Sequence, residues 1–235
     1  MTTAQAHIHL AGEQAAFARG GNRLIFIHPE DADACIKVQR PDRSPARKRA
    51  ERRFPRNLRP LRHFDDNWQE QRVYRRLQHH IGSASFDYVP RLHGPVATNL
   101  GPGLCSELIR DDDGAISLPL KQYLWLHGQS AALTAALAEF HRGWQHLGMP
   151  SRALLLHNLV VQCQGGVPAR IVVIDGLGWP QPLTPAWWCR PLARRKARKR
   201  LAGLQRAILR LLEKRERNEP YGVHGWLEEA GRDRT

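Results

Sequence analysis

The chain has 235 residues, of which 42% are hydrophobic, and a formal net charge of +14. This length suits one large domain or two small lobes around a sizeable core. No run of about 18 uncharged apolar residues is present, so we expect no membrane span. The first residues lack the basic start and apolar stretch of a secretory signal, so we expect a cytoplasmic protein. The high charge favours phosphates, nucleic acid or anionic lipid head groups without indicating which.

The chain has four cysteines, and none of them has the CxxC spacing of a structural zinc site. All of them lie beside apolar residues, so we expect small core side chains rather than reactive thiols. They are Cys35, Cys105, Cys163 and Cys189.

Residues up to Val38 predict strands joined by turns. The GGNR stretch at 20–23, before an apolar run, is typical of a hairpin turn. In the run CIKV, Cys35 and Lys37 point to one face of a strand, and the two apolar residues point to the other.

Residues 40–62 form the first of two strongly basic regions, with prolines at 41, 45, 55 and 60. Four prolines and many like charges are incompatible with a long regular element. We therefore expect a mobile loop or insertion here.

A helix is predicted over residues 67–81, with Asp65 or Asp66 as its N-cap and Gly82 at its end. Its apolar residues share one face, and Glu70 lies on that same stripe. A carboxylate in such a position is costly unless it has a partner.

The rest of the chain predicts two further pairs of strands and two helices. An acidic, exposed connection is expected at 110–115, and the helix that follows it ends at Gly148. The last helix is basic and has one apolar stripe, so it either docks on the body with a solvated basic face or binds an anionic partner. The expected strands are 88–98, 103–109, 154–162 and 169–176, and the expected helices are 130–147 and the basic helix from 193 onward.

A strand-rich first part followed by a helix-rich second part predicts a bilobal α+β fold. We place the N-lobe at residues 1–109 and the C-lobe at residues 110–235.

Four polar residues, each in an apolar setting, occur in an order that resembles the protein-kinase-like fold. Kinases place a lysine on the third strand, pair it with a glutamate of the following helix, and hold metal with an Asn and an Asp. The matching residues are Lys37, Glu70, Asn158 and Asp175. The resemblance implies that the Lys–Glu pair meets the phosphates of ATP or another nucleotide, and that the last two residues hold Mg²⁺.

Within that fold class the chain resembles the YrbL family of bacterial PhoP regulatory network proteins. The match covers roughly residues 15 to 200, with the basic region at 40–62 as an insertion. It implies a kinase-like fold and a regulatory association, without a known substrate. The stretches that carry it are HPEDADACIKV, EQRVYRRL, VPRLHGPVATNLGPG, and HNLV together with VVIDGLG.

The chain departs from the kinase pattern at two motifs. Ala153 stands where kinases carry the catalytic Asp, five residues before the metal-binding Asn, so no catalytic residue is assigned. Gly20 and Gly21 are the candidate glycines of a phosphate-binding loop. The chain lacks the spaced Gly-x-Gly-x-x-Gly motif there. Glu107 and Ile109 are expected at the hinge, where their backbone groups would meet a purine ring.

Each candidate also has a plainer explanation. Lys37 is compatible with an edge-strand lysine that extends its amine to water, and Glu70 with a surface pair to Arg72 or another nearby Arg. Asn158 is compatible with a turn residue, and Asp175 with a simple strand-to-turn exit.

Two functions remain open from the sequence. The first is a nucleotide-binding, kinase-like regulatory protein, including a degenerate phosphotransferase with an unknown acceptor. The alternative is a non-catalytic module whose basic regions bind RNA, an acidic protein or lipid head groups. A hydrolase is disfavoured because no GxSxG nucleophile motif is present.

Overall fold

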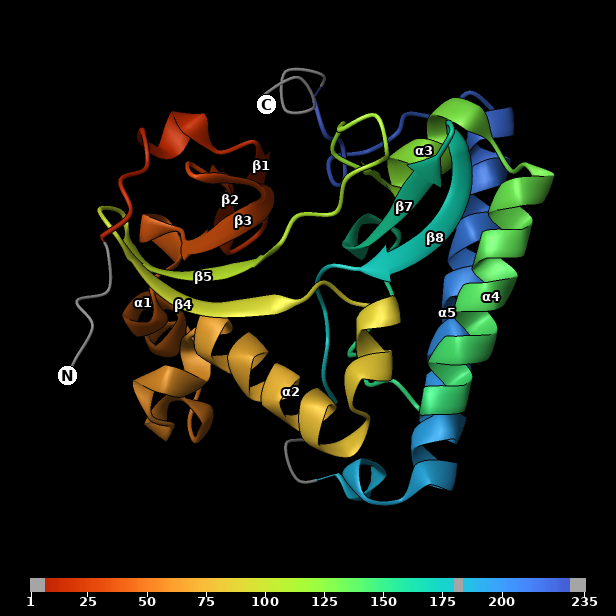
Figure 1. Cartoon of the computed structure of the whole chain (residues 1–235). Helices are drawn as coiled ribbons and strands as arrows, with labels where there is room; N and C mark the ends of the chain where they lie inside the picture. The colour runs from red at the N-terminus through yellow and green to blue at the C-terminus, as the bar shows by residue number, and fades with distance from the viewer. Residues whose placement is uncertain (1–6, 180–183, 229–235) are drawn as a thin grey trace. The chain divides into compact units, whose positions relative to one another are not determined.

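The computed structural model describes residues 7–179 and 184–228, which form two compact units (Figure 1). The described part of the first unit is 7–75 and 91–108, and that of the second is 76–90, 109–179 and 184–228. The predicted mixed α+β composition, with strands first and helices later, is confirmed. Among the described residues, no helix is long and apolar enough to span a bilayer.

The first unit contains a five-stranded antiparallel sheet in the order β1-β2-β3-β5-β4. Its central strand β3 is buried on both faces from Ala34 to Val38. Ile36 and Val38 pack into an apolar cluster with Leu24 and Phe26. The other face of β3 therefore presents Lys37 from a fixed backbone. The strands are β1 (Ala18–Arg19), β2 (Arg23–His28), β3 (Asp31–Gln39), β4 (Leu92–Thr98) and β5 (Gly101–Glu107).

Helix α2 (Asp66–His80) forms where the sequence predicts a helix. Asp65 is its cap, because the carboxylate accepts bonds from Asn67 N at 2.9 Å and Trp68 N at 3.2 Å. Gly82 ends it with φ 82°, and its amide donates to Leu77 O at 3.1 Å.

The basic region at 40–62 contains more regular structure than expected. A short helix, α1 (Pro45–Ala50), begins with proline at its first position and is capped by Ser44, whose hydroxyl accepts from Arg47 N at 3.3 Å. The prediction that no long regular element forms here is confirmed, since α1 has only six residues, and proline is well suited to the first turn of such a helix. Three 3₁₀ turns accompany it, at Pro41–Arg43, Arg56–Leu58 and Leu61–Phe64.

The second unit joins a small sheet to three helices. Strands β7 (Leu159–Gln164) and β8 (Val167–Val173) form a hairpin, and β6 (Leu118–Pro119) pairs with β7. Helix α4 packs on β8, and α4 and α5 lie side by side along their length (Figure 1). Strand β6 and helix α3 are elements that the sequence did not predict. The helices are α3 (Leu120–His127), α4 (Ala131–Leu147) and α5 (Arg190–Glu216).

The acidic connection at 110–115 is not simply exposed. Asp111 is half-buried, and its carboxylate accepts bonds from Ser117 Oγ at 2.6 Å and Cys163 N at 2.9 Å. Asp112 accepts from Gly165 N at 2.6 Å. These carboxylates secure the turn of the β7–β8 hairpin, so the prediction of an exposed turn is wrong for Asp111.

Three cysteines are buried as predicted, whereas Cys189 is exposed and corrects the prediction for that residue. Burial raises the pKa of Cys35 and raises the pKa of Cys105 to about 11. Because the thiolate is the reactive form, we expect iodoacetamide at pH 8 to label Cys189 alone in the native protein, as read by mass spectrometry. The C189S variant should label only after unfolding. Rapid labelling of a second cysteine in the native protein would contradict this.

Candidate functional site

The first unit holds a buried ion pair at the centre of its sheet. Lys37 Nζ donates to Glu70 Oε1 at 2.8 Å, and the side chains of both residues are only 8% exposed. Strand β3 directs Lys37 toward α2, and the helix places Glu70 on the face that covers the sheet. The structure therefore brings these two predicted residues together across 33 positions of sequence.

Two residues that sequence reasoning missed also belong to this cluster. Arg23, at the start of β2, also donates to the Glu70 carboxylate, and its Nη1 lies 3.3 Å from Asn67 Oδ1. Asn67 in turn donates to Lys37 O at 3.0 Å. One carboxylate thus bridges two buried cations, an arrangement that depends on every partner being present.

The alternation of side chains along paired strands could have predicted that Arg23 lies on the same face of the sheet as Lys37. In the antiparallel pair of β2 and β3, Ile25 lies opposite Lys37. Residues two apart in a strand share a face, so Arg23 points to the same side of the sheet as Lys37.

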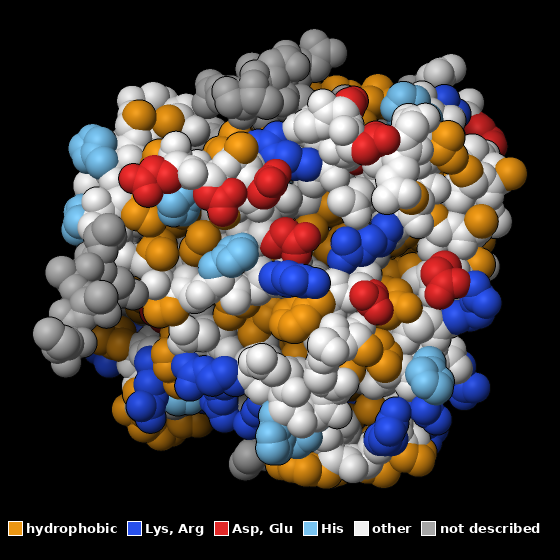
Figure 2. Space-filling view, viewed as in Figure 1, with side chains coloured by type: hydrophobic (Ala, Val, Ile, Leu, Met, Phe, Trp, Pro, Cys, Tyr) orange, Lys and Arg blue, Asp and Glu red, His pale blue; other side chains and the backbone are white. Residues whose placement is uncertain are grey.

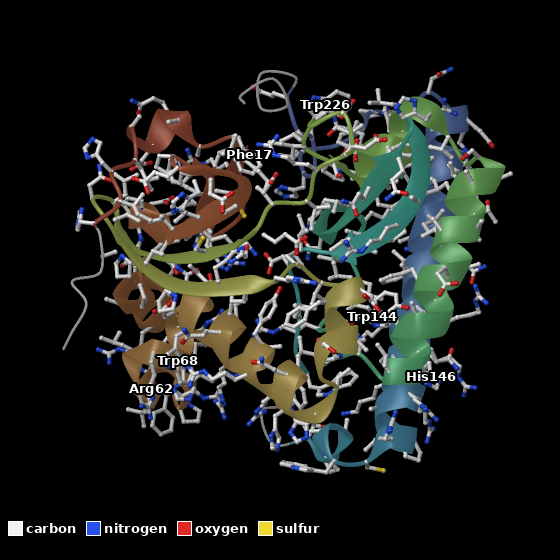
Figure 3. All side chains as sticks on the ribbon, viewed as in Figure 1. Phe17, Arg62, Trp68, Trp144, His146 and Trp226 are labelled. Atoms are coloured by element: carbon white, nitrogen blue, oxygen red, sulfur yellow. The ribbon has the colours of Figure 1, made fainter. Side chains whose placement is uncertain are left out.

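The plainer pairing of Glu70 with Arg72 is not the one observed. The Arg72 guanidinium lies over the Trp68 ring, 5.5 Å from its centroid, and Arg62 lies 5.6 Å from the same ring. Figure 3 shows Arg62 and Trp68 next to each other. Arg72 therefore contacts the Trp68 ring through a cation–π interaction, whereas Glu70 pairs with cations of the sheet.

Gly20 and Gly21 form the exposed turn between β1 and β2. Gly20 N donates to Arg23 O at 2.8 Å, and the Arg40 guanidinium donates to the carbonyls of Gly20 at 3.2 Å and Gly21 at 3.4 Å. The turn is thus held by its own hairpin and by one arginine. Its role in phosphate binding stays a prediction.

Glu107 and Ile109 have backbone partners within their own units. The Glu107 amide donates to Arg91 O at 2.8 Å, and its carboxylate accepts from Arg91 N at 2.8 Å. The Ile109 carbonyl accepts from Ser117 N at 3.0 Å. A purine ring would have to compete with these bonds, and the hinge role of both residues stays a prediction.

The second unit brings Asn158 and Asp175 to one end of the β7–β8 hairpin. Asn158 directly precedes β7, and its carbonyl accepts from Ile174 N at 2.8 Å, next to Asp175. Asp175 is exposed, and its Oδ1 accepts from Gly176 N at 2.6 Å. A Cβ at Gly176 would lie 3.1 Å from Asn158 Nδ2, so glycine with φ 79° leaves room for the amide. Two oxygen-bearing side chains of this kind suit a hard cation.

Ala153, which stands where kinases carry the catalytic Asp, lies beside the turn formed by Asp175 and Gly176. Arg152 N donates to Gly176 O at 2.9 Å, and Ala153 O lies 3.1 Å from the point where a Gly176 Cβ would stand. Alanine offers no ionisable group there. Within the described residues, no cluster of three or more His, Cys, Asp or Glu side chains could hold a metal.

The chain near residue 224 packs against His157, which sequence reasoning missed. Lys121 Nζ donates to His224 O at 2.7 Å, and a Cβ at Gly225 would lie 2.5 Å from His157 Cβ. Burial lowers the pKa of His157, with His224 and Lys121 acting in the same direction and Asp175 opposing them. The neighbouring Trp226 is visible in Figure 3.

Comparison with known proteins identifies one family. The family described as PhoP regulatory network protein YrbL matches residues 8–209. The chain is also 29% identical over 115 residues to proteins described as uncharacterized protein YrbL in Escherichia coli (strain K12) and Shigella flexneri. That stretch is 47% of this chain and 44% of each relative, so the match spans less than half of the relatives' length.

Proposed function

The chain belongs to the YrbL family of PhoP regulatory network proteins, and we propose that it binds a nucleotide through a protein-kinase-like fold and acts as a regulator. The observation that carries the proposal is the buried pair of Lys37 and Glu70, with 2.8 Å between Nζ and Oε1. An antiparallel sheet that presents a lysine from its third strand to a glutamate of the next helix supports it.

Lys37 has the role of orienting the phosphates. A lysine side chain has four flexible carbon–carbon links, and a buried carboxylate fixes the position of its ammonium in advance. Glu70 supplies that carboxylate, and Asn67 holds the strand backbone at Lys37. Because the ammonium does not have to be ordered on binding, less affinity is lost to conformational entropy.

Asn158 and Asp175 have the role of holding Mg²⁺. Their amide and carboxylate oxygens are the donors that magnesium prefers, and they share one end of a rigid hairpin. When bound, the ion would neutralise charge on the phosphates.

The proposal concerns binding and not rapid phosphate transfer. A general base contributes about 10²- to 10⁴-fold to the rate of a reaction. Ala153 stands at the position of that base, so transfer to any acceptor would be slow. Nucleotide binding coupled to regulation is therefore the activity to test first.

The test is a thermal-shift titration with ATP and with ADP, each in the presence and absence of Mg²⁺. A ligand at about 100 times its Kd adds about 2.7 kcal/mol, which raises the melting temperature of a chain of this size by about 5–11 °C. We expect the shift to require Mg²⁺ and to be lost in the K37A and D175A variants. Each variant is compared with its own unliganded melting temperature, so a loss of stability does not mimic a loss of binding.

Two matched controls separate the site from general charge effects. Lys48 pairs with Asp66 at 2.9 Å in the same unit as Lys37, so K48A removes a paired lysine elsewhere. D87A removes an exposed aspartate from the same unit as Asp175. Both controls should keep the full shift. The absence of a shift in the unmodified protein, or a full shift in K37A and D175A, would contradict the proposal.

A further inference from the structure

The outward face of helix α5 carries a row of four cations, Arg195, Lys199, Arg206 and Arg210, which we call the cationic row. All four are exposed, at intervals of 4, 7 and 4 residues. These spacings place the cations on one side of a helix. The opposite side is buried in the second unit through Leu201, Leu204, Ile208 and Leu211.

The row is not neutralised by neighbouring carboxylates. Residues 190–212 contain nine Lys and Arg residues and no Asp or Glu. The ion pairs of this helix lie near its end, where Glu213 and Glu219 contact Lys214 and Arg217. Within the part of the chain that the structure describes, the four row cations form no ion pair. The row therefore produces a positive field that an anionic partner would neutralise.

Other basic residues of α5 have structural partners, which sets the row apart. Arg194 Nε donates to His146 O at 2.8 Å, and Lys196 Nζ donates to Thr184 Oγ1 at 2.6 Å. Lys196 also lies over the Trp179 ring, 5.3 Å from its centroid. These two residues attach the helix to its unit, whereas the row faces solvent.

The first half of α5 is hollowed beside the row. One hollow of about 420 Å³ is lined by four cations and two apolar residues: Arg195, Lys196, Arg198, Lys199, Leu192 and Ala202. A groove of about 770 Å³ adjoins it between α4 and α5 and shares Arg198 and Ala202. Figure 2 shows Lys and Arg side chains gathered near the place where α5 begins.

The groove also contains an unmet polar atom. His141 lines it, and its buried Nε2 has no hydrogen-bond partner among the described atoms. The guanidiniums of Arg142 and Arg198 also line this groove, and they are groups that can donate to phosphate oxygens.

An aromatic side chain stands just before the helix. Trp188 is 66% exposed, whereas Trp179 and Trp187 are buried. The ring makes an edge contact with His80, 6.2 Å between ring centroids, and otherwise stays exposed two residues before a basic helix. Single-stranded nucleic acid uses this combination, because phosphates follow the charge and bases stack on exposed rings.

We propose that the cationic row, its hollow and Trp188 form a binding surface for single-stranded nucleic acid. Seven of the nine basic residues in 190–212 are arginine, whose planar fork suits phosphate oxygens. From Arg195 to Arg210 the helix rises about 22 Å, so the row can contact several successive phosphates of one extended strand.

Two other anionic partners fit this face less well. A helix that lies on a membrane needs an exposed apolar face, but the apolar face of α5 is buried in its unit. A protein interface has a core poor in charged residues, whereas the outward face here is dominated by them. A single strand of nucleic acid fits this face better, because its phosphates need neither an exposed apolar face nor an interface core poor in charged residues.

The test measures binding of labelled 12-nucleotide oligo-U RNA and oligo-dT DNA by fluorescence anisotropy between 50 and 200 mM salt. The row variant replaces all four cations with glutamine. We expect the slope of log affinity against log salt to shrink by about 3, because each phosphate contact on a single strand contributes about 0.7. The W188A variant should bind about 5- to 150-fold more weakly, the effect of one lost stack, and W188F should keep most of the affinity.

The matched control removes four charges from the other basic region. It replaces Arg49, Arg52, Arg56 and Arg59 with glutamine, so its net charge equals that of the row variant. This control should keep nearly the full salt slope. An equal loss of slope in both variants would overturn the proposal in favour of unspecific charge, and so would the absence of oligonucleotide binding.

A further arm tests the membrane alternative with phosphatidylserine vesicles. Tighter row-dependent binding to vesicles than to oligonucleotides would also overturn the proposal. The row variant should keep the Mg²⁺-dependent nucleotide shift, because its changes lie outside the residues proposed for that site. The two proposals can therefore fail separately.

Discussion

Replacing Glu70 with alanine is expected to lower the free energy of unfolding by about 3–5 kcal/mol, because it removes a carboxylate that bridges Lys37 and Arg23. Both cationic side chains are only 8% exposed, so water cannot readily replace the lost partner. The buried charges would then remain together with their mutual repulsion. Urea denaturation followed by tryptophan fluorescence measures the change, with m-values compared to detect a change in the unfolding transition.

An exposed ion pair provides the control. Glu139 contacts Arg142 on the surface of α4, and the side chains are 62% and 75% exposed. The E139A variant should cost less than about 1 kcal/mol. A triple variant, R23L together with K37M and E70L, should recover part of the loss, since no buried charge remains. If E70A is no more costly than E139A, the buried cluster does not stabilise the sheet and α2.

Replacing Gly143 with alanine is expected to destabilise the protein, although alanine is the better helix former. A Cβ at this position of α4 would lie 1.7 Å from Tyr88 Oη and 2.2 Å from Cζ. The ring therefore has to move, and overpacking of this kind costs about 1–3 kcal/mol or more. Thermal and urea unfolding of G143A would show the loss.

Replacing Gly203 of α5 with alanine is expected to have the opposite effect on stability. No atom lies within 4 Å of a Cβ placed at Gly203, so G203A should stabilise the protein by about 1 kcal/mol. In a Y88A background, G143A should also become neutral or stabilising, which a double-mutant cycle can measure. Equal effects of the two glycine substitutions would mean that the Tyr88 contact does not restrict α4.

Local sequence patterns were sufficient for much of the fold. The caps and the apolar stripe predicted α2 and α4 with nearly the observed ends, and the expected strands 154–162 and 169–176 overlap β7 and β8. Each of these signals comes from residues close together in the chain. Helix α3 lacked such signals, because it has only eight residues and no side-chain cap.

The candidate site was predicted in part, for the same reason. The stripe of α2 indicated that Glu70 needed a partner, but the partners lie 33 and 47 residues away. Which cations reach the carboxylate depends on how α2 packs on the sheet, and no local pattern encodes that packing. Cys189 shows the opposite case, since apolar neighbours in sequence did not bury it.

Asn67 has a consequence for how the first unit can move. Its amide donates to Lys37 O on β3 at 3.0 Å and to Pro102 O on β5 at 3.3 Å, and it is 8% exposed. Any tilt of the start of α2 away from the sheet would break both bonds and the Lys37–Glu70 pair at once. These buried contacts therefore tie the first turns of the helix to two strands of the sheet and oppose their separation. A change in the side-chain torsions of Lys37 therefore reorients its amine at lower cost than a displacement of the helix, which would break all of these contacts together.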